Sequence, residues 1–368
     1  MIIAVDCYES GAYATGVGRS IENILKELVP MMPDDEFIVL SREPIEKYVP
    51  PDIVQYVLSP DKGYFRWQNG PFRRKLKQIQ PDILIASNYT LPVLTRWKSI
   101  LVVHDVSFIS HPEWYTTKES IKRKYFVQRS VRKAEYVVVV SRTVKGELMK
   151  YLDVEPGKIE VVYHGVDDRF QKSPENRIDE WVQQKGLENK LIVGYLGSIF
   201  NRRHIPVLVE SLELLRRDLP ELVLYIIGKD MTHPPQDMAT LLKKDWIKWE
   251  DKLGSEDIIL FYSALDVFAY ISEYEGFGLP PLEALACGTV PVLLNKSSLG
   301  EIYQDMAFLS DEPVVEQVAE ALKNAIQDFK AKSRILENFA QKRALFSWKN
   351  SANGFKRLID NIGRHRHA

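Results

Sequence analysis

The sequence predicts an α/β protein made of two doubly wound domains, each with a parallel sheet. The chain has 368 residues, more than the roughly 100–200 that one domain usually contains. Short apolar, β-branched runs alternate with helical stretches, and this alternation stops at the polar segment 171–190 and then restarts. The runs are continuously apolar, which is typical of strands buried on both faces of a parallel sheet.

Twelve apolar runs are the expected strands. Those of the first half are Ile2–Val5, Phe37–Leu40, Ile53–Leu58, Ile83–Ala86, Ile100–Val103, Tyr136–Val140 and Ile159–Tyr163. Those of the second half are Leu191–Leu196, Leu222–Ile227, Ile258–Leu260, Val267–Ile271 and Val290–Leu294. From residue 315 onward the pattern indicates helices only. We interpret segment 171–190 as an inter-domain connection, and we expect domains at 1–172 and 173–346.

Composition excludes several classes of protein. The 49 basic and 50 acidic residues leave a net charge of −1, which disfavours a dedicated nucleic-acid binder. No apolar run approaches the roughly 18–20 residues of a membrane span, and the first residues do not resemble a secretory signal. Cys7 and Cys287 cannot form a disulfide framework. We therefore expect a cytoplasmic protein.

The clearest motif is SEYEGFGLPPLEALACG at residues 272–288, directly after the strand expected at Val267–Ile271. Ligands of parallel sheets bind outside the carboxyl ends of the strands. Gly278 and the prolines after it suit the start of a helix, whose free N–H groups can bind phosphate. Glu275 and Glu283 flank this point, and carboxylates accept hydrogen bonds from the hydroxyls of a sugar. Alternatively, the two glutamates only stabilise the helix dipole.

This segment resembles the Glu-x7-Glu signature of the retaining glycosyltransferases of family 4, and the resemblance extends over nearly the whole chain. It implies the GT-B fold, in which two Rossmann-like domains face an interdomain cleft. By this resemblance, Glu275 contacts the transferred sugar and Glu283 contacts the nucleotide ribose. The backbone N–H groups of Phe277, Gly278 and Leu279 would bind the sugar hydroxyls and the diphosphate.

A second motif, GSIFNRRH at Gly197–His204, resembles the family's Gly-Ser/Arg…Arg-Lys loop. The resemblance places Gly197 and Ser198 at the donor, and it implies that Arg202 and Arg203 neutralise the departing diphosphate. The family usually has lysine at the position of Arg203, and arginine keeps the charge while binding two phosphate oxygens at once. The alternative is a solvated basic turn.

Two weaker signals also concern the donor. The motif TGVGR at Thr15–Arg19 resembles the family's N-terminal glycine loop, so Gly16 and Gly18 would approach the donor phosphates and Arg19 would contact the acceptor. A purely structural turn is the alternative. Lys229 follows the strand expected at Leu222–Ile227 and is either a phosphate or ribose contact or a surface lysine.

His104 and Asp105 follow the strand expected at Ile100–Val103. The matching histidine of the family hydrogen-bonds the transferred sugar. Asp105 is assigned to the acceptor, and it could also orient the imidazole or cap the next segment. The sequence HGVD at His164–Asp167 matches a family motif that is most often structural, near the domain boundary.

We predict that transfer needs no metal ion and no cofactor besides the donor. The sequence contains no Asp-x-Asp and no zinc-ligand spacing, and arginines with a helix N-terminus can stabilise the diphosphate electrostatically. The EGFGLPPLEA form of the motif favours mannose or a deoxyhexose as the transferred sugar. GDP is the favoured nucleotide, and UDP and dTDP are the alternatives. The resemblance also implies that the leaving phosphate accepts the acceptor's proton on the same face.

Two segments combine aromatic and basic residues. Tyr64–Lys77 carries five basic residues and Lys118–Lys133 carries seven. Such segments suit an anionic membrane surface or a pyrophosphate-bearing acceptor, and the alternative is a solvated helix face. By resemblance, the acceptor is a glycan or a polyprenyl-diphosphate-linked glycan at the inner face of the membrane. The last segment resembles the family's closing helix, so 347–368 is assigned to the first domain.

Two other functions fit the same fold. One is a nucleotide-sugar epimerase of GT-B fold, which the transferase version of the Glu275–Glu283 segment disfavours. The other is a non-catalytic GT-B-like binding or scaffold protein, against which the four charged residues Arg202, Arg203, Glu275 and Glu283 argue. Transfer or donor hydrolysis would separate the enzymes from the binding protein, and product analysis would separate the two enzymes.

Overall fold

The computed structural model describes residues 1–11, 16–45, 53–59 and 63–364. The chain forms two compact units, Met1–Gly165 together with Leu345–Ala368, and Val166–Ala344. The first boundary lies between Gly165 and Val166, whereas the sequence analysis placed it at residue 172. The reason is that Phe170 packs edge-on against Tyr262 of the second unit, with ring centroids 6.1 Å apart.

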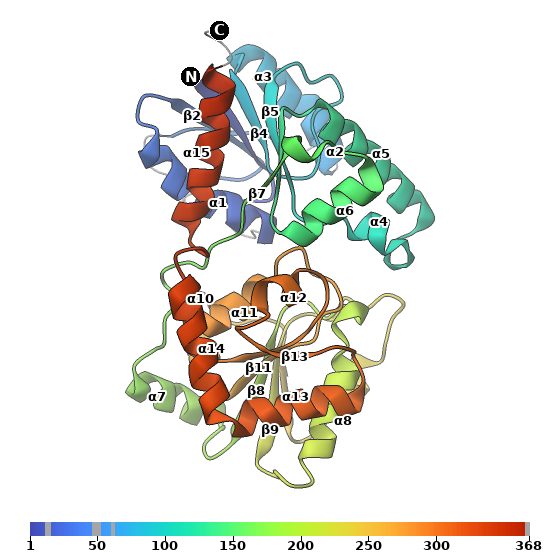
Figure 1. Ribbon diagram of the computed structural model, residues 1–368, viewed down its shortest axis with the longest axis vertical. Coiled ribbons are helices and arrows are strands. Elements are labelled where there is room, and N and C mark those ends of the chain that lie inside the picture. Colours follow the sequence, from blue (N-terminus) through green and yellow to red (C-terminus); the bar gives the residue numbers. More distant parts are fainter. Residues whose placement is uncertain (12–15, 46–52, 60–62, 365–368) are drawn as a thin grey trace. The chain divides into compact units, whose positions relative to one another are not determined.

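The first unit contains a seven-stranded sheet in which all neighbouring strands are parallel (Figure 1). Its order is β3-β2-β1-β4-β5-β6-β7. The strands are β1 Ile2–Cys7, β2 Glu36–Ser41, β3 Val54–Val57, β4 Ile83–Ala86, β5 Lys98–Val103, β6 Tyr136–Val139 and β7 Ile159–Val161. All seven expected strands are present. The side chains of β1, β2, β4, β5 and β6 are mostly buried, whereas those of the edge strand β3 are exposed or half-buried.

The helices of the first unit connect the parallel strands. They are α1 Gly16–Leu28, α2 Tyr64–Trp67, α3 Arg73–Ile79, α4 Ser107–Ser110, α5 Thr117–Lys133, α6 Arg142–Leu152 and α15 Trp348–Arg364. A π-helical turn over residues 68–72 joins α2 to α3. The last helix, α15, lies against α1 (Figure 1), and it buries Phe355, Leu358, Ile359 and Ile362.

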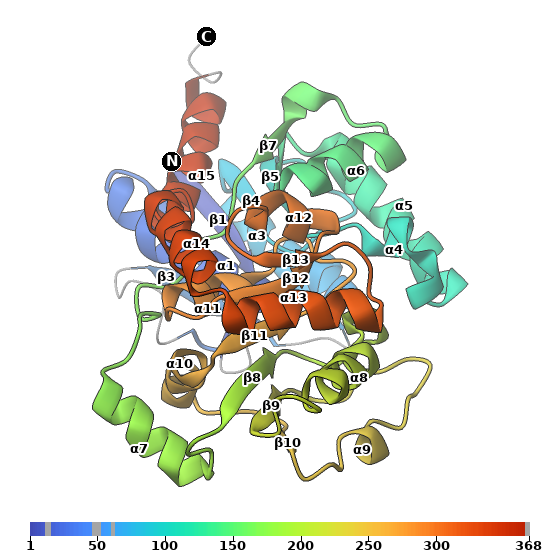
Figure 2. The same cartoon turned by 60° about the horizontal axis from the view of Figure 1, so that its bottom comes forward.

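The second unit contains a six-stranded parallel sheet in the order β10-β9-β8-β11-β12-β13 (Figure 2). Its strands are β8 Leu191–Leu196, β9 Leu222–Ile227, β10 Ile247–Glu250, β11 Val267–Tyr270, β12 Pro291–Leu294 and β13 Phe308–Ser310. Its helices are α7 Glu175–Lys185, α8 Ile205–Leu215, α9 Met238–Leu241, α10 Ser255–Ala264, α11 Leu279–Ala286, α12 Ser297–Tyr303, α13 Val315–Gln327 and α14 Phe329–Lys342.

Three expectations for the second unit were wrong. Ile258–Leu260 is not a strand, because this run lies within α10, whose buried face includes Leu260 and Phe261. The polar segment 171–190 contains helix α7, which is anchored by Ile178 and Trp181. Strands β10 and β13 were missed, since the first carries half-buried Lys248 and Glu250 and the second is only three residues long.

The order of strands reverses once in each sheet, between β1 and β4 and between β8 and β11. A doubly wound sheet opens a crevice at this point, outside the carboxyl ends of the two strands. The loops after β1, β4, β8 and β11 are therefore the places to look for a ligand site. Among the helices that the structure describes, none combines the length and apolar character of a membrane-spanning segment.

Candidate active site

In the second unit, the loops after β8 and β11 meet through an ion pair. The Nη2 of Arg203 lies 3.1 Å from the Oε1 of Glu275, and the two side chains are 11% and 15% exposed. The pair lies at the switch point of the second sheet. The sequence analysis assigned both residues to the site of the sugar donor.

The carboxylate of Glu275 is fixed by three donors that share one oxygen. Its Oε1 accepts from Arg203, from the hydroxyl of Tyr270 at 3.0 Å and from the hydroxyl of Ser272 at 2.8 Å. All three contacts converge on Oε1 and fix the orientation of the side chain.

The backbone of Glu275 is held as firmly as its side chain. Its N–H donates to the hydroxyl of Ser297 at 3.0 Å, and its carbonyl accepts from the hydroxyl of Ser298 at 2.7 Å. Both serines belong to the first turn of α12, so this helix positions the loop after β11.

Arg203 lies beneath the loop that follows β8. Its Nη1 donates to the carbonyl of Ser198 at 2.7 Å and to the hydroxyl of Tyr195 at 3.2 Å. Gly197 has φ +141, and a Cβ at that position would lie 2.4 Å from Nη1, so only glycine leaves room for the guanidinium. Burial would lower the pKa of Arg203, but the neighbouring Tyr195, Tyr270 and Glu275 outweigh burial and raise it.

Other residues that the sequence assigned to the sugar donor are partly or fully accessible to solvent. Ser198 and Lys229 are exposed, and the N–H of Ile199 donates to the carbonyl of Lys229 at 2.8 Å. The guanidinium of Arg202 lies over the ring of Phe200, 4.4 Å from its centroid. The carbonyl of Arg202 accepts from the N–H of Glu273 at 2.8 Å, which ties the two loops together.

Helix α11 begins where the sequence predicted a phosphate site. Gly278 precedes it with φ +89, and a Cβ there would lie 2.6 Å from the side chain of Leu299. The carbonyl of Gly278 accepts from the hydroxyl of Tyr303. Phe277 is buried, and Leu279 is the first helical residue. The N-terminus of α11 is therefore held by tight packing.

Glu283 lies in the second turn of α11, which begins at Leu279. Its Oε2 accepts from the hydroxyl of Tyr262 at 2.9 Å. Tyr262 is fully buried, and burial together with Glu283 raises its pKa well above the usual value. The hydroxyl thus stays protonated and keeps donating to the carboxylate.

In the first unit, His104 follows β5 and is buried. Its Nε2 lies 3.0 Å from the carbonyl of Ser87, which can only accept, so Nε2 carries the proton. Burial lowers the pKa of His104. Asp105 accepts from the hydroxyl of Tyr89 at 2.6 Å and from the N–H of Ser107 at 2.9 Å. Asp105 thus binds the first residue of α4 from outside the helix, whose N-cap is Val106.

A second histidine packs against His104. The ring centroids of His104 and His164 are 5.6 Å apart, and His164 lies 5.5 Å from the ring of Trp348 in α15. Burial, followed by the charge of His104, lowers the pKa of His164 well below its usual value. A Cβ on Gly165 would lie 2.2 Å from the backbone nitrogen of Trp348, so this motif packs closely against the last helix.

The glycines of the first loop have different surroundings. Gly16 is exposed at the start of α1, and a Cβ there would meet no atom within 4 Å, whereas a Cβ on Gly18 would lie 2.0 Å from the carbonyl of Glu9. Gly18 therefore permits close packing of α1 against the loop after β1. Arg19 is exposed. Thr15, which begins the motif, lies outside the described residues.

Sequence reasoning missed a pocket at the switch point of the first sheet. The pocket has a volume of about 460 Å³. It is lined by Glu9, Tyr64, Phe65, Asn88, Tyr89, Thr90, Phe108, Glu119, Lys122, Arg123, Phe126 and Val127. Glu9 and Asn88 follow β1 and β4, and the amide of Asn88 lies 3.4 Å from the Glu9 carboxylate. The polar residues directly after the strand expected at Ile83–Ala86 were the available signal.

Tyr89 connects this pocket to His104. Their ring centroids are 5.6 Å apart, and Tyr89 has φ +60, a left-handed conformation that is uncommon for a bulky residue. Such strain is concentrated at functional sites. The π-helical turn after α2 is a second irregularity beside the pocket, and π-helical turns also occur frequently at functional sites.

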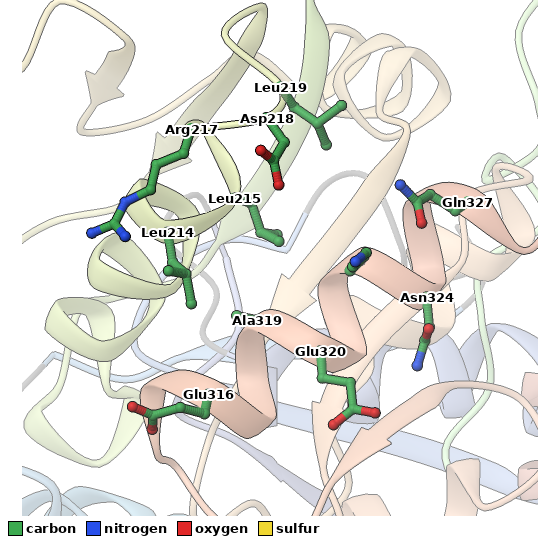
Figure 3. A pocket seen from close by; sticks show the side chains of 11 residues that line it. Leu214, Leu215, Arg217, Asp218, Leu219, Glu316, Ala319, Glu320, Asn324 and Gln327 are labelled. Atoms are coloured by element: carbon green, nitrogen blue, oxygen red, sulfur yellow. The ribbon is translucent and has the colours of Figure 1, made fainter.

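Another pocket, of about 620 Å³, lies between the end of α8 and helix α13 (Figure 3). One side is lined by Leu214, Leu215, Arg217, Asp218 and Leu219, and Glu316 and Glu320 lie on the other. The first group lies at the end of α8 and in the segment before β9, away from the loops that follow β8 and β11. None of the predicted site residues lines it.

Within the described ranges, no group of three or more His, Cys, Asp or Glu side chains is arranged to hold a metal ion. The charged groups in the loops at the second switch point include Arg202, Arg203, Glu275 and Glu283.

Two family models match consecutive parts of the chain. The model described as Glycosyltransferase Family 4 matches residues 14–170, and the model described as Glycosyl transferases group 1 matches residues 177–343. The first match corresponds to the unit that contains His104, and the second to the unit that contains Arg203 and Glu275.

Curated relatives have similar descriptions at low identity. The serotype-specific mannosyltransferase WbdA of Escherichia coli is 22% identical over 98% of this chain, which spans 48% of that relative's length. The O-antigen chain mannosyltransferase B of Escherichia coli is 24% identical over 77% of this chain and 76% of the relative. This chain thus spans about half the length of the first relative and three quarters of the second.

Solved structures show the same fold. A crystal structure of Anabaena Alr3699/HepE in complex with UDP and glucose superposes with a TM-score of 0.77 at 18% identity, covering 98% of this chain and all of that chain. WaaG, a glycosyltransferase involved in lipopolysaccharide biosynthesis, gives a TM-score of 0.77 at 17% identity over 95% of this chain and 98% of its own.

Proposed function

This chain belongs to the glycosyltransferases of family 4, with a group 1 domain in its second unit, and from that premise we propose that it is a retaining mannosyltransferase. In this proposal the donor is a nucleotide-diphosphate sugar and the acceptor is a glycan. The observation that carries the proposal is the fixed carboxylate of Glu275 beside the N-terminus of α11, at the switch point of the second sheet.

The proposed roles follow the chemistry of each group. Oε2 of Glu275 would accept from a hydroxyl of the transferred sugar, and Glu283 would accept from the ribose. The N–H groups of Gly278 and Leu279, at the positive end of α11, would bind the diphosphate. Arg202 would add positive charge as the leaving group departs, and Ser198 would offer a hydrogen-bond donor. Lys229 is a further candidate for a phosphate or ribose contact.

We propose retention of configuration through a proton transfer on one face of the sugar. The bond between the anomeric carbon and the phosphate oxygen breaks, and the acceptor oxygen forms a bond to that carbon from the same side. The acceptor's proton passes to the released phosphate oxygen. His104, neutral because burial lowers its pKa, would hydrogen-bond the sugar and would not serve as the base.

The donor sugar is proposed from two lines of support. The relatives described above are named mannosyltransferases, and the EGFGLPPLEA motif favours mannose or a deoxyhexose. We favour GDP as the nucleotide, while UDP and dTDP are the alternatives to test, because one structural neighbour contains UDP. No metal ion or other cofactor is part of the proposal.

For the acceptor, we propose that a glycan reaches the pocket at the first switch point. Tyr64, Phe65 and Phe126 offer aromatic surfaces to the C–H face of a sugar, and Phe65 and Phe126 are 4.8 Å apart. Glu9 and Asn88 offer acceptors and donors to its hydroxyls. Arg19 is exposed and could contact a longer acceptor.

A lipid-linked acceptor would require a membrane surface nearby. Helix α5 presents Ile121 and Tyr125, which are 65% and 62% exposed, among the basic residues Lys118, Lys122 and Lys124. This combination suits peripheral binding to an anionic bilayer. Co-sedimentation with vesicles containing anionic lipid should pellet the protein at low salt and less at high salt. Absence of pelleting in both conditions would contradict this part of the proposal.

The test of the function uses the full chain. A thermal-shift panel of GDP, UDP, dTDP and ADP identifies the nucleotide, since a ligand that binds only the folded protein raises Tm. The corresponding mannose donor is then incubated with mannose-containing oligosaccharides, with and without EDTA, and the anomeric configuration of the product is determined by NMR. We expect EDTA-resistant transfer with retention. Absence of nucleotide binding, inversion, or release of an epimerised sugar would overturn the proposal.

A further inference from the structure

The guanidinium of Arg203 is turned toward the protein. Of its two terminal nitrogens, Nη1 is used by Ser198 and Tyr195, and Nη2 by Glu275. The side chain is 11% exposed, and its guanidinium carbon lies 4.9 Å from the ring centroid of Tyr270. Lys229, the other basic residue that the sequence placed at the donor phosphates or ribose, is by contrast exposed to solvent.

The cage around Arg203 is built from large buried residues. Tyr195 and Tyr270 are both buried, and their rings stack with centroids 5.9 Å apart at an angle of 18°. Burial raises the pKa of both hydroxyls, so they remain donors across the physiological range. The hydroxyl of Tyr195 donates to the carbonyl of Ser198, and that of Tyr270 donates to Glu275. The donors of the cage therefore end on two acceptors, the carbonyl of Ser198 and Oε1 of Glu275.

We infer that Arg203 is a positioning residue, which holds the Glu275 carboxylate for the transferred sugar and does not bind the diphosphate. This inference rests on the proposed function and changes the role that the sequence suggested for Arg203. A lysine has one nitrogen with three donors and lacks a planar fork, so it cannot contact Tyr195, Ser198 and Glu275 in this geometry. Arginine thus suits this position, because Nη1 contacts Tyr195 and Ser198 while Nη2 contacts Glu275.

A residue that contacts the diphosphate would change both the preference for a nucleoside diphosphate and kcat. A group that binds the diphosphate favours a nucleoside diphosphate over the matching monophosphate. A group that orients Glu275 affects only what Glu275 touches, namely the sugar. Outer residues that orient a functional group typically change activity by about 10- to 100-fold. We therefore expect Arg203 to influence kcat and not the preference for diphosphate.

The test compares R203M with R202M, the adjacent arginine that we assign to the diphosphate. Isothermal titration with GDP and GMP, or with UDP and UMP if uracil nucleotides bind, gives the ratio of the two dissociation constants for each variant. We expect R203M to keep the ratio of the unsubstituted protein within about twofold, and R202M to lower it by about tenfold, as the loss of a charge-assisted hydrogen bond does. In transfer assays, R203M should lose about 10- to 100-fold in kcat with the donor KM little changed.

Y270F provides a second variant in case R203M is unstable. It removes the hydroxyl that donates to Glu275 while keeping the buried ring. It should lower kcat in the same way, and its effect should not add to that of R203M, because both act on one carboxylate. R203K should recover only part of the activity.

A loss of GDP-over-GMP preference in R203M would overturn the inference, and so would an unchanged kcat. These results are distinct from failure of the proposed function, in which the unsubstituted protein binds none of the nucleotides or transfers no sugar. Melting temperatures of all variants show whether each one is folded before its titration is interpreted.

Discussion

The two switch points are built on different principles. In the second unit, the side chains Arg203, Glu275 and Glu283 are fixed by buried tyrosines and serines. In the first unit, the matching place is a pocket lined by aromatic rings, with His104 buried beside it. A carboxylate held in advance suits a ligand that is always the same, whereas an aromatic surface tolerates related sugars. Under the proposed function, the donor site would be preorganised and the acceptor site would provide an aromatic surface.

The largest expected effect comes from removing the fixed charge in the second unit. E275Q keeps the size of the side chain but weakens its hydrogen bonds to the sugar and to Arg203. We expect kcat to fall by about 10²- to 10³-fold, as on loss of a preorganised electrostatic group. E273Q, in the same loop and paired with His204 at 3.3 Å, is the matched control and should retain activity. Equal losses in both variants would mean that the loop, and not the Glu275 charge, matters.

The next effect tests the ribose role of Glu283. E283Q should raise the donor KM and the dissociation constant of the nucleotide by about tenfold, the typical worth of a hydrogen bond to a charged group. Y262F, which removes the donor to Glu283, should weaken binding less, because the carboxylate remains. Nucleotide titrations of both variants check this. A dissociation constant unchanged in E283Q would place the ribose elsewhere.

A smaller effect tests the aromatic surface of the first unit. F65A removes a ring that is 40% exposed at the pocket, so the fold should be preserved. We expect the acceptor KM to rise by about 2- to 10-fold with the donor KM unchanged, as for the loss of one aromatic contact. F329A removes an even more exposed ring, in α14 of the second unit, and should change neither constant. If F65A behaves like F329A, the acceptor does not use this pocket.

The smallest effect concerns the histidine pair. The pKa values of His104 and His164 in the folded chain lie below 6.5, so these rings stay neutral while those of the unfolded chain take up protons. Their contribution to stability is complete above about pH 6.5 and is lost as pH falls toward the folded pKa values. H164Q should reduce this loss by less than about 1 kcal/mol between pH 7.5 and 6. Urea unfolding at several pH values measures it, and an unchanged pH dependence would contradict the assignment.

The fold could be predicted because a strand buried on both faces is a continuous run of apolar residues. Ile83–Ala86, Leu191–Leu196 and Leu222–Ile227 have the predicted bounds. Ile258–Leu260 has the same composition but belongs to a helix, since three apolar residues fit either element. Strand β10 escaped prediction because it carries the charged residues Lys248 and Glu250, which bond Lys185 of α7 and Tyr225 of the neighbouring strand β9.

The site could be predicted from the sequence only where its residues lie close together in one short segment. Glu275, Gly278 and Glu283 share a loop and a helix, and their positions follow from their spacing. The partners of Glu275 do not, because Arg203 lies 72 residues away. Tyr195 and Tyr270 read as ordinary strand residues, and their hydroxyl contacts depend on strand pairing. The pocket of the first unit is assembled from five separate segments, so no local pattern marks it.

The first unit is made of both ends of the chain, with helix α15 closing it. A ribosome releases the polypeptide in order, so this closing helix emerges only after every residue of the second unit has been synthesised. The second unit can therefore fold while the first still lacks the helix that covers α1. During translation, the surface that later receives Phe355, Leu358 and Ile359 stays open to chaperones. Ribosome-bound chains halted before residue 345 should be cleaved by protease in the first unit sooner than in the second.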